Sequence, residues 1–185
     1  MISARAALAT ALLGVAAAGC APNPAESYVR GHGLTVADLP LRDRVAIYQE
    51  AVGGAFQVGD PSLYLLLDPR LLPRTGGYDA GSERMTSGLQ NSLLKSHIVQ
   101  GLCEPATEAS KLAHCNAPLA GYVVRFSEVF RMPADTVSVN LYVQRYSTPT
   151  SVGVSELRFE RIYKLVHLPT GWTAVVEGRV QLESP

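Results

Sequence analysis

The sequence lacks an excess of charge of either sign, since 16 Lys and Arg residues balance 16 Asp and Glu residues in a chain of 185. Proteins that bind the nucleic-acid backbone usually carry a positive surface, so this balance argues against DNA or RNA as a partner. The chain also lacks the phosphate-binding patterns G-x-x-x-x-G-K-[ST] and G-x-G-x-x-G, and it has no H-E-x-x-H pair. We therefore expect no cofactor and no bound metal.

Long hydrophobic runs are scarce. The run from Ala6 to Ala18 is too short for a comfortable membrane span, which needs about 20 apolar residues. It follows the positive charge of Arg5 and precedes a box of small residues that ends in Cys20. A charged start, an apolar middle and a small-residue end are typical of a secretory signal peptide.

The box Ala17-Ala18-Gly19-Cys20 resembles the end of a bacterial lipoprotein signal peptide. The resemblance implies that residues 1–19 are cleaved and that the Cys20 thiol carries a diacylglyceryl group. Residues 20–37 would then form a lipidated tether, and Ala21 does not match the Asp of the family's inner-membrane retention signal. We expect a cell-envelope lipoprotein, exported and anchored in the outer membrane facing the periplasm. Secretion without lipid is the alternative.

The sequence has only three cysteines. If Cys20 carries lipid, Cys103 and Cys115 remain as a pair in an oxidising compartment, where we expect them to form a disulfide. The closed loop of about a dozen residues would stabilise the fold by roughly 3 kcal/mol. A metal or redox site of Cys103, His114 and Cys115 is the alternative, although the spacing matches no zinc ribbon or C-x-x-C pair.

The first half of the mature chain predicts two helices and one strand. Apolar residues recur every three or four positions from Leu41 to Phe56, which favours an amphipathic helix. The continuous apolar run Ser62–Leu67 predicts a buried, central strand. A second helix is expected to begin at an N-cap at Thr86 or Ser87 and to continue to Cys103.

The last third predicts four strands, because apolar and polar residues alternate there. The strands are expected within 122–131, 136–146, 157–165 and 172–182, joined as an antiparallel meander. One face of the third strand is charged, which predicts that this face is exposed to solvent; its residues are Glu156, Arg158, Glu160 and Lys164.

This order of elements, with the closing hairpin Phe159–Val166 and Thr170–Val176, resembles the NTF2-like and cystatin-like α+β superfamily. The resemblance implies a cone in which a curved antiparallel sheet wraps a helix layer. We expect residues 38–185 to form a single α+β domain, with two main helices packed on a curved antiparallel sheet of about five strands.

Enzymes of that superfamily place polar groups on the inner face of the sheet. Here Arg161 and Glu128 are in phase with apolar, inward-facing neighbours, so they could pair in a cavity as a ligand or proton-transfer site. The alternative is that a β-bulge or a strand end turns them outward, or that they form structural ion pairs. His97 lies on the second predicted helix, and no Asp or Glu at a suitable spacing orients it, so we expect a partly buried histidine.

The Gly- and Pro-containing segment from Asp68 to Arg84 predicts a long loop, and loops of this length are often functional. We expect its side chains to contact a ligand or partner, the candidates being Arg70, Arg74, Tyr78 and Arg84. The function we expect is a non-catalytic binding or interaction module. Its partner would be another envelope protein or a small apolar ligand, and an NTF2-like enzyme or small-ligand binder using Arg161 and Glu128 is the alternative.

Overall fold

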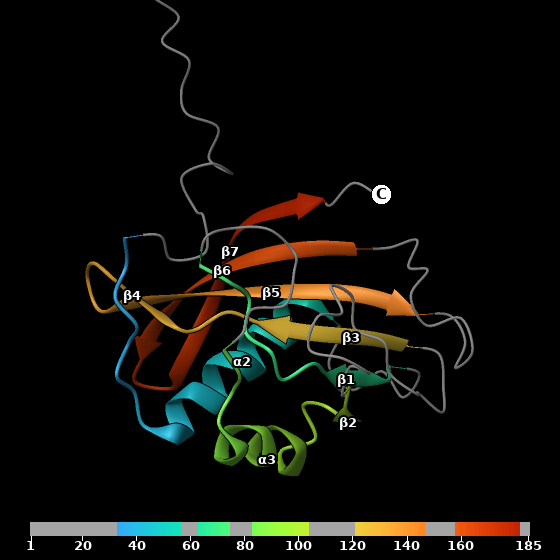
Figure 1. Cartoon of the computed structure of the whole chain (residues 1–185). Coiled ribbons are helices and arrows are strands. Elements are labelled where there is room, and N and C mark those ends of the chain that lie inside the picture. The colour runs from blue at the N-terminus through green and yellow to red at the C-terminus, as the bar shows by residue number, and fades with distance from the viewer. Residues whose placement is uncertain (1–32, 57–62, 75–82, 104–120, 147–157, 182–185) are drawn as a thin grey trace, which may run out of the picture.

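The computed structural model describes residues 33–56, 63–74, 83–103, 121–146 and 158–181. Two helices pack against a mixed seven-strand sheet that does not close into a barrel (Figure 1). The α+β class and the two helices are confirmed, but the expected sheet of about five antiparallel strands is wrong. The signal peptide and most of the tether lie outside the described residues.

The helices are α2 (Leu41–Ala55) and α3 (Ser87–Lys95). The strands are β1 (Leu65–Leu67), β2 (Gly101–Leu102), β3 (Gly121–Phe126), β4 (Phe130–Met132), β5 (Thr136–Tyr146), β6 (Arg158–Leu168) and β7 (Gly171–Gln181). Their order in the sheet is β2-β1-β3-β5-β6-β7, with β4 paired to β5.

Helix α2 confirms the predicted amphipathic helix. Its buried positions recur at helical spacing and are Ile47, Tyr48, Ala51 and Val52. The helix approaches the sheet closely at Gly54, where an added Cβ would lie 2.7 Å from Cε1 of Tyr163 on β6. Glycine is therefore needed at this position for packing, although it lowers helix propensity.

Helix α3 begins as predicted, because the Thr86 hydroxyl accepts a hydrogen bond from the Leu89 amide at 3.4 Å. It ends earlier than predicted. The amides of His97 and Ile98 donate to the carbonyls of Leu94 and Leu93, and His97 adopts a left-handed φ of 55°. This Schellman motif stops the helix and leaves His97 exposed rather than partly buried.

The first three strands explain why the sheet is mixed. Strand β1 is parallel to both β2 and β3, and α3 forms the connection between β1 and β2. Strand β1 thus has a neighbour on each side but lies one place from the sheet edge, not at its centre. Its continuous apolar sequence is typical of a parallel strand that is buried on both faces.

The four-strand antiparallel meander is confirmed for β3, β5, β6 and β7. The predicted strand 122–131 is interrupted, however, so β4 is a separate strand. Between Phe126 and Phe130 the chain advances four residues while β5 advances three, from Leu141 back to Ser138. The extra residue makes a β-bulge, and the Ser127 hydroxyl accepts the Asn140 amide within it at 2.9 Å.

The helices cover one face of the sheet with an apolar core to which α2, α3 and the strands contribute. The other face is also buried, and it carries polar side chains on β3, β5 and β6 beside small apolar clusters. The predicted solvated face of β6 is therefore wrong at Glu160, which is 4% exposed and accepts Nδ2 of Asn140 at 2.7 Å. Within the described part of the chain, no helix is long and apolar enough to cross a membrane.

Candidate functional site

The structure separates the two residues predicted to form an inner-face site. Arg161 on β6 donates to the carbonyl of Gly54 at 2.6 Å, and its guanidinium lies 5.3 Å from the ring centre of Phe159. Glu128 instead pairs with Arg44 of α2 at 3.4 Å. The structure therefore does not bring Arg161 and Glu128 together, and each forms a contact with α2 instead.

The β-bulge explains this outcome at Glu128. The bulge shifts the alternation between Phe126 and Phe130, and within it Glu128 meets Arg44 of α2. Arg44 and Glu128 remain 22% and 20% exposed, so their ion pair is partly screened by water. Both residues contribute to packing around α2 rather than to a cavity.

Tyr48 lies beside this ion pair and is fully buried. Its hydroxyl donates to the Ser127 carbonyl at 3.1 Å, and its ring centre lies 4.5 Å from that of Phe126. Burial raises the pKa of Tyr48 well above its usual value, although the neighbouring Arg44 opposes the shift. Tyr48 is therefore a neutral hydrogen-bond donor that joins α2 to the bulge.

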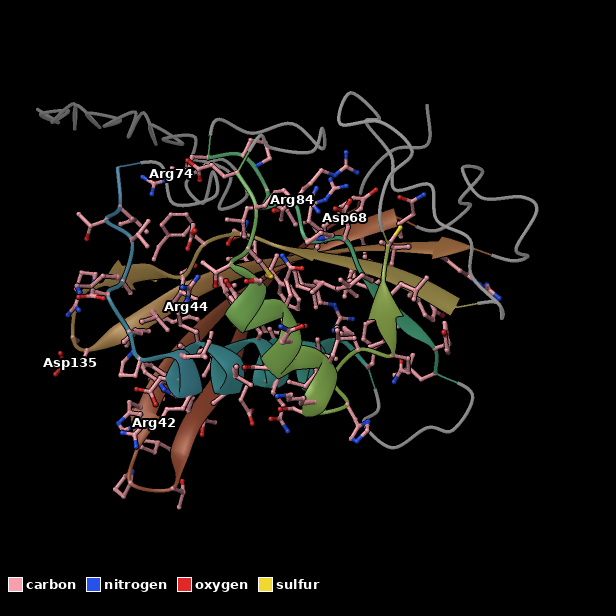
Figure 2. The ribbon with its side chains drawn as sticks, turned by 60° about the horizontal axis from the view of Figure 1, so that its bottom comes forward. Arg42, Arg44, Asp68, Arg74, Arg84 and Asp135 are labelled. Atoms are coloured by element: carbon pink, nitrogen blue, oxygen red, sulfur yellow. The ribbon has the colours of Figure 1, made fainter. Side chains whose placement is uncertain are left out.

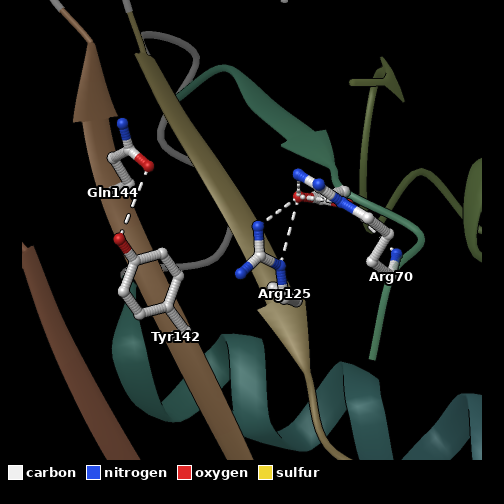
Figure 3. A network of polar contacts seen from close by, with 5 residues as sticks. Arg70, Arg125, Tyr142 and Gln144 are labelled. Atoms are coloured by element: carbon white, nitrogen blue, oxygen red, sulfur yellow. Dashed lines mark hydrogen bonds and ion pairs between the residues drawn. The ribbon is translucent and has the colours of Figure 1, made fainter. Parts of the chain in front are cut away.

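A buried ion network occupies the opposite face of the sheet (Figure 3). Asp68 follows β1 directly and accepts hydrogen bonds from the guanidinium groups of Arg70 and Arg125. The three side chains are at most 2% exposed. The burial of Arg70 removes it from any contact surface, contrary to its predicted role.

The network extends onto β5 through an aromatic ring. The Arg125 guanidinium carbon lies 5.6 Å from the ring centre of Tyr142, and the Tyr142 hydroxyl donates to Gln144 at 3.4 Å. Burial alone would raise the pKa of Asp68, but the hydrogen bond from Arg70 and the charge of Arg125 lower it below its usual value. Asp68 is therefore ionised at neutral pH, and the network joins β1, β3 and β5 mechanically.

The sequence of β3 contains a signal for this network. Arg125 is the only charged residue of β3, and it stands between the apolar residues Val124 and Phe126. A lone charge in such a strand needs a buried partner. Asp68 is that partner, at the carboxyl end of the neighbouring strand.

Two of the other predicted contact residues, Arg74 and Arg84, lie on the same side of the molecule as Asp68 (Figure 2). Arg74 is exposed, and its guanidinium lies 5.4 Å from the ring centre of Phe130. Arg84 is also exposed, and it forms an antiparallel bridge with Arg70 through the backbone. Tyr78 lies outside the described residues. The segment is not a simple surface loop, because Leu71 and Leu72 are buried against the sheet.

An open cavity of about 230 Å³ lies where α2 begins and the β6–β7 hairpin turns. We call it the hairpin cavity. Its lining residues are Ala37, Leu39, Asp43, Arg131, Asp135, Thr136, Val137, His167 and Trp172. Figure 2 places Asp135 and Arg42 at this end of the molecule, away from Asp68. None of the lining residues was singled out as a site residue from the sequence.

Trp172 and His167 form one wall of the hairpin cavity. Their ring centres lie 4.9 Å apart in an edge-to-face arrangement. The indole Nε1 of Trp172 is buried and has no hydrogen-bond acceptor among the described residues. Buried indole N–H groups usually find a partner, since leaving one unpaired costs about 1–3 kcal/mol.

Strained backbone and opposed charges adjoin the cavity. Ala134 and Asp135 have left-handed φ values of 59° and 52° in the β4–β5 turn, a conformation that non-glycine residues rarely adopt. Asp43 is 25% exposed and lies 3.5 Å from Arg42, which is 87% exposed, so that pair is weak. The cavity therefore combines an apolar lining with charged groups of both signs.

The predicted disulfide and metal alternative stay untested. Cys103 is buried, whereas His114 and Cys115, like the lipidation residue Cys20, lie outside the described residues. In the described ranges, no group of three or more His, Cys, Asp or Glu side chains could hold a metal ion.

No protein-family model, curated protein or solved structure matches this chain.

Proposed function

We propose that the protein is a lipid-anchored module of the cell envelope that binds a ligand or partner without catalysing a reaction. The N-terminal sequence supports the anchor. The box Ala17–Cys20 follows a short apolar run, and this pattern favours lipidation at Cys20. Two or more acyl chains give stable anchoring, since each buried methylene contributes about 0.8 kcal/mol. The anchor would hold the domain at the outer membrane, facing the periplasm.

The observation that carries the binding function is the contrast between the hairpin cavity and the rest of the domain. Arg161, Glu128 and Asp68 are each engaged in separate contacts that join elements of the fold. The cavity is open, and the side chains of Arg131 and Asp135 form no hydrogen bond or ion pair with the described residues. A concave, mostly apolar surface with a few uncommitted polar groups is typical of a binding site.

The fold supports the resemblance to the NTF2-like and cystatin-like cone in part. This fold and the cone both have a helix layer on one face of a sheet, and the last strands of the sheet form a long hairpin. The parallel strands β1 and β2 differ from the antiparallel sheet that the resemblance implies. We keep the cone as a proposal for the fold. The function is argued from the site, because one fold can host many functions.

Intact mass of the membrane-extracted protein, with and without reductant and alkylation, tests the anchor. We expect a mass that begins at Cys20 and includes acyl chains, with two thiols that appear only after reduction. The matched control is Cys20→Ala, which should lose the lipid mass and the membrane association together. A soluble wild-type product without lipid would overturn the anchor, and free thiols in it would overturn the Cys103–Cys115 disulfide.

A further inference from the structure

The residues that lead into α2 are docked along β4 (blue in Figure 1). The Ala37 amide donates to the Val129 carbonyl, and the Arg131 amide donates to the Thr35 carbonyl, each at 2.8 Å. The pairing is antiparallel. We call residues 33–40 the strap.

The strap is held to the domain by few contacts. Ala37 is its one buried residue, at 5% exposure, and Leu39 is half-buried and packs on the core. The rest of the strap is more open, and Val36 is 40% exposed. An alanine side chain buries little apolar area, so packing adds little to the two backbone hydrogen bonds. Segments with so few buried contacts open at a lower free energy than the rest of a domain.

Strand β4 does not depend on the strap for its place in the sheet. Its three residues pair with β5 on the side away from the strap. Strand β5 is in turn paired with β3 on one side and with β6 on the other, and its inner side chains Val139, Leu141 and Val143 are fully buried. The strap can therefore leave β4 without breaking a pairing between two strands of the sheet.

We propose that the strap is a conformational device, which detaches from β4 while the rest of the domain stays folded and thereby opens the hairpin cavity. Ala37 and Leu39 both line that cavity, so detachment removes part of its wall. The inference rests on the proposed function, because it gives the anchored tether a way to act on the binding cavity.

The order of the contacts suits a strap that peels from its N-terminal end. The strap directly follows residues 20–32 of the predicted tether, so a pull on the tether acts on the strap first. The hydrogen bond at Thr35 lies nearer to this end than the bond at Ala37, so the pull loads the two bonds one after the other. At the other end the Pro40 carbonyl accepts the Arg44 amide at 3.1 Å, which keeps the strap attached to α2.

Native-state hydrogen exchange tests whether the strap opens by itself. The chain from residue 20 onward, without lipid, is followed amide by amide in low concentrations of urea. We expect the Ala37 and Arg131 amides to exchange about a hundredfold or more faster than the Ser127 amide, after correction for intrinsic rates. Ser127 is the matched control, because its amide donates to the Asn140 carbonyl of β5 and not to the strap. The strap amides should also depend little on urea, since a local opening exposes little surface.

A variant pair tests the coupling between the two hydrogen bonds. Ala37→Pro removes the amide that donates to Val129, and it should speed exchange of the Arg131 amide about tenfold or more while Ser127 stays protected. The matched control is Thr35→Ala, which changes an exposed side chain but keeps the carbonyl that accepts Arg131, and its exchange rates should stay close to those of the wild type.

Quenching of Trp172 fluorescence by acrylamide tests the link to the cavity. Trp172 is the only tryptophan of the chain, and it lines the hairpin cavity. We expect quenching to rise in Ala37→Pro and to be unchanged in Thr35→Ala, because detachment of the strap lets the quencher approach the cavity wall.

Three results would overturn the inference. If the Ala37 and Arg131 amides exchange at the rate of Ser127 with the same urea dependence, the strap opens only when the whole domain unfolds. Equal loss of Ser127 protection in Ala37→Pro would lead to the same conclusion. Faster Arg131 exchange in that variant without a change in quenching would separate the strap from the cavity. None of these results bears on the anchor, which the intact-mass experiment decides.

Discussion

The two faces of the sheet are both buried but are built from different chemistry. On β5 the residues that face the helices are Val137, Val139, Leu141 and Val143, and the residues that alternate with them are Ser138, Asn140, Tyr142 and Gln144. The first set is held by apolar packing against α2 and α3. The second set adjoins the Asp68–Arg70–Arg125 network, which is held by charge and hydrogen bonds.

The comparison shows that alternation along a strand does not by itself identify a solvated face. A polar residue on a strand is exposed only if nothing covers it, and a covered polar face must satisfy its groups internally. Asn140 and Glu160 do so across β5 and β6. On the apolar face, a change in side-chain shape should lower stability by a small amount. On the polar face, removing one partner leaves a buried charge unpaired, so the loss should be larger.

The largest expected effect comes from breaking the polar face at its central carboxylate. Asp68→Asn keeps the shape but leaves two buried arginines without their anion, so we expect the free energy of unfolding to fall by about 3–5 kcal/mol. Urea unfolding measures this loss. The matched control is Asp43→Asn, whose exposed pair with Arg42 should contribute less than about 1 kcal/mol. Equal losses in the two variants would contradict a special role for the buried network.

The same face should give the protein an acid-sensitive stability. Because the folded-state pKa of Asp68 lies below its unfolded value of about 3.9, its contribution is present above that pH and is lost as the pH falls through the folded pKa. Unfolding free energies measured between about pH 6 and pH 2 should fall less steeply in Asp68→Asn than in the wild type. Parallel curves would show that Asp68 does not titrate differently in the two states.

A smaller effect is expected on the apolar face at Gly54. Gly54→Ala improves helix propensity, but its Cβ would meet the fully buried Tyr163 ring at 2.7 Å, so we expect a net destabilisation of about 1–3 kcal/mol. Gly88→Ala on α3 is the matched control, because nothing lies within 4 Å of its added Cβ. That variant should be neutral or stabilising by up to about 1 kcal/mol in thermal unfolding. A stabilising Gly54→Ala would disprove the close packing of α2 on β6.

Elements with strong local signals could be predicted from the sequence. The helical spacing of apolar residues gave α2, the Thr86 cap gave the start of α3, and period-two alternation gave β5 and the β6–β7 hairpin. The end of α3 was missed because His97, rather than glycine, occupies the left-handed position of its cap. The break between β3 and β4 could not be predicted, because a β-bulge inserts one residue and has no repeating pattern in the sequence.

The candidate site could be predicted far less well than the fold. Arg161 and Glu128 share a phase with apolar neighbours in the sequence, but phase does not specify register across a bulge. The Gly and Pro residues around Arg70 predict a surface loop, yet the ion pair with Asp68 holds Arg70 in the interior. The hairpin cavity joins residues of α2, the β4–β5 hairpin and the β6–β7 hairpin, and no local pattern connects them.

Hydrophobic period, a helix cap and the turns between strands act over a few residues, so the elements that they specify can be predicted from the chain alone. Contacts between distant segments bury the second face of the sheet, pair Asp68 with Arg125 fifty-seven positions away, and bring Leu39 and Trp172 to the same cavity. These features depend on register and on what covers a surface. Both are set by contacts between segments that are distant in the chain.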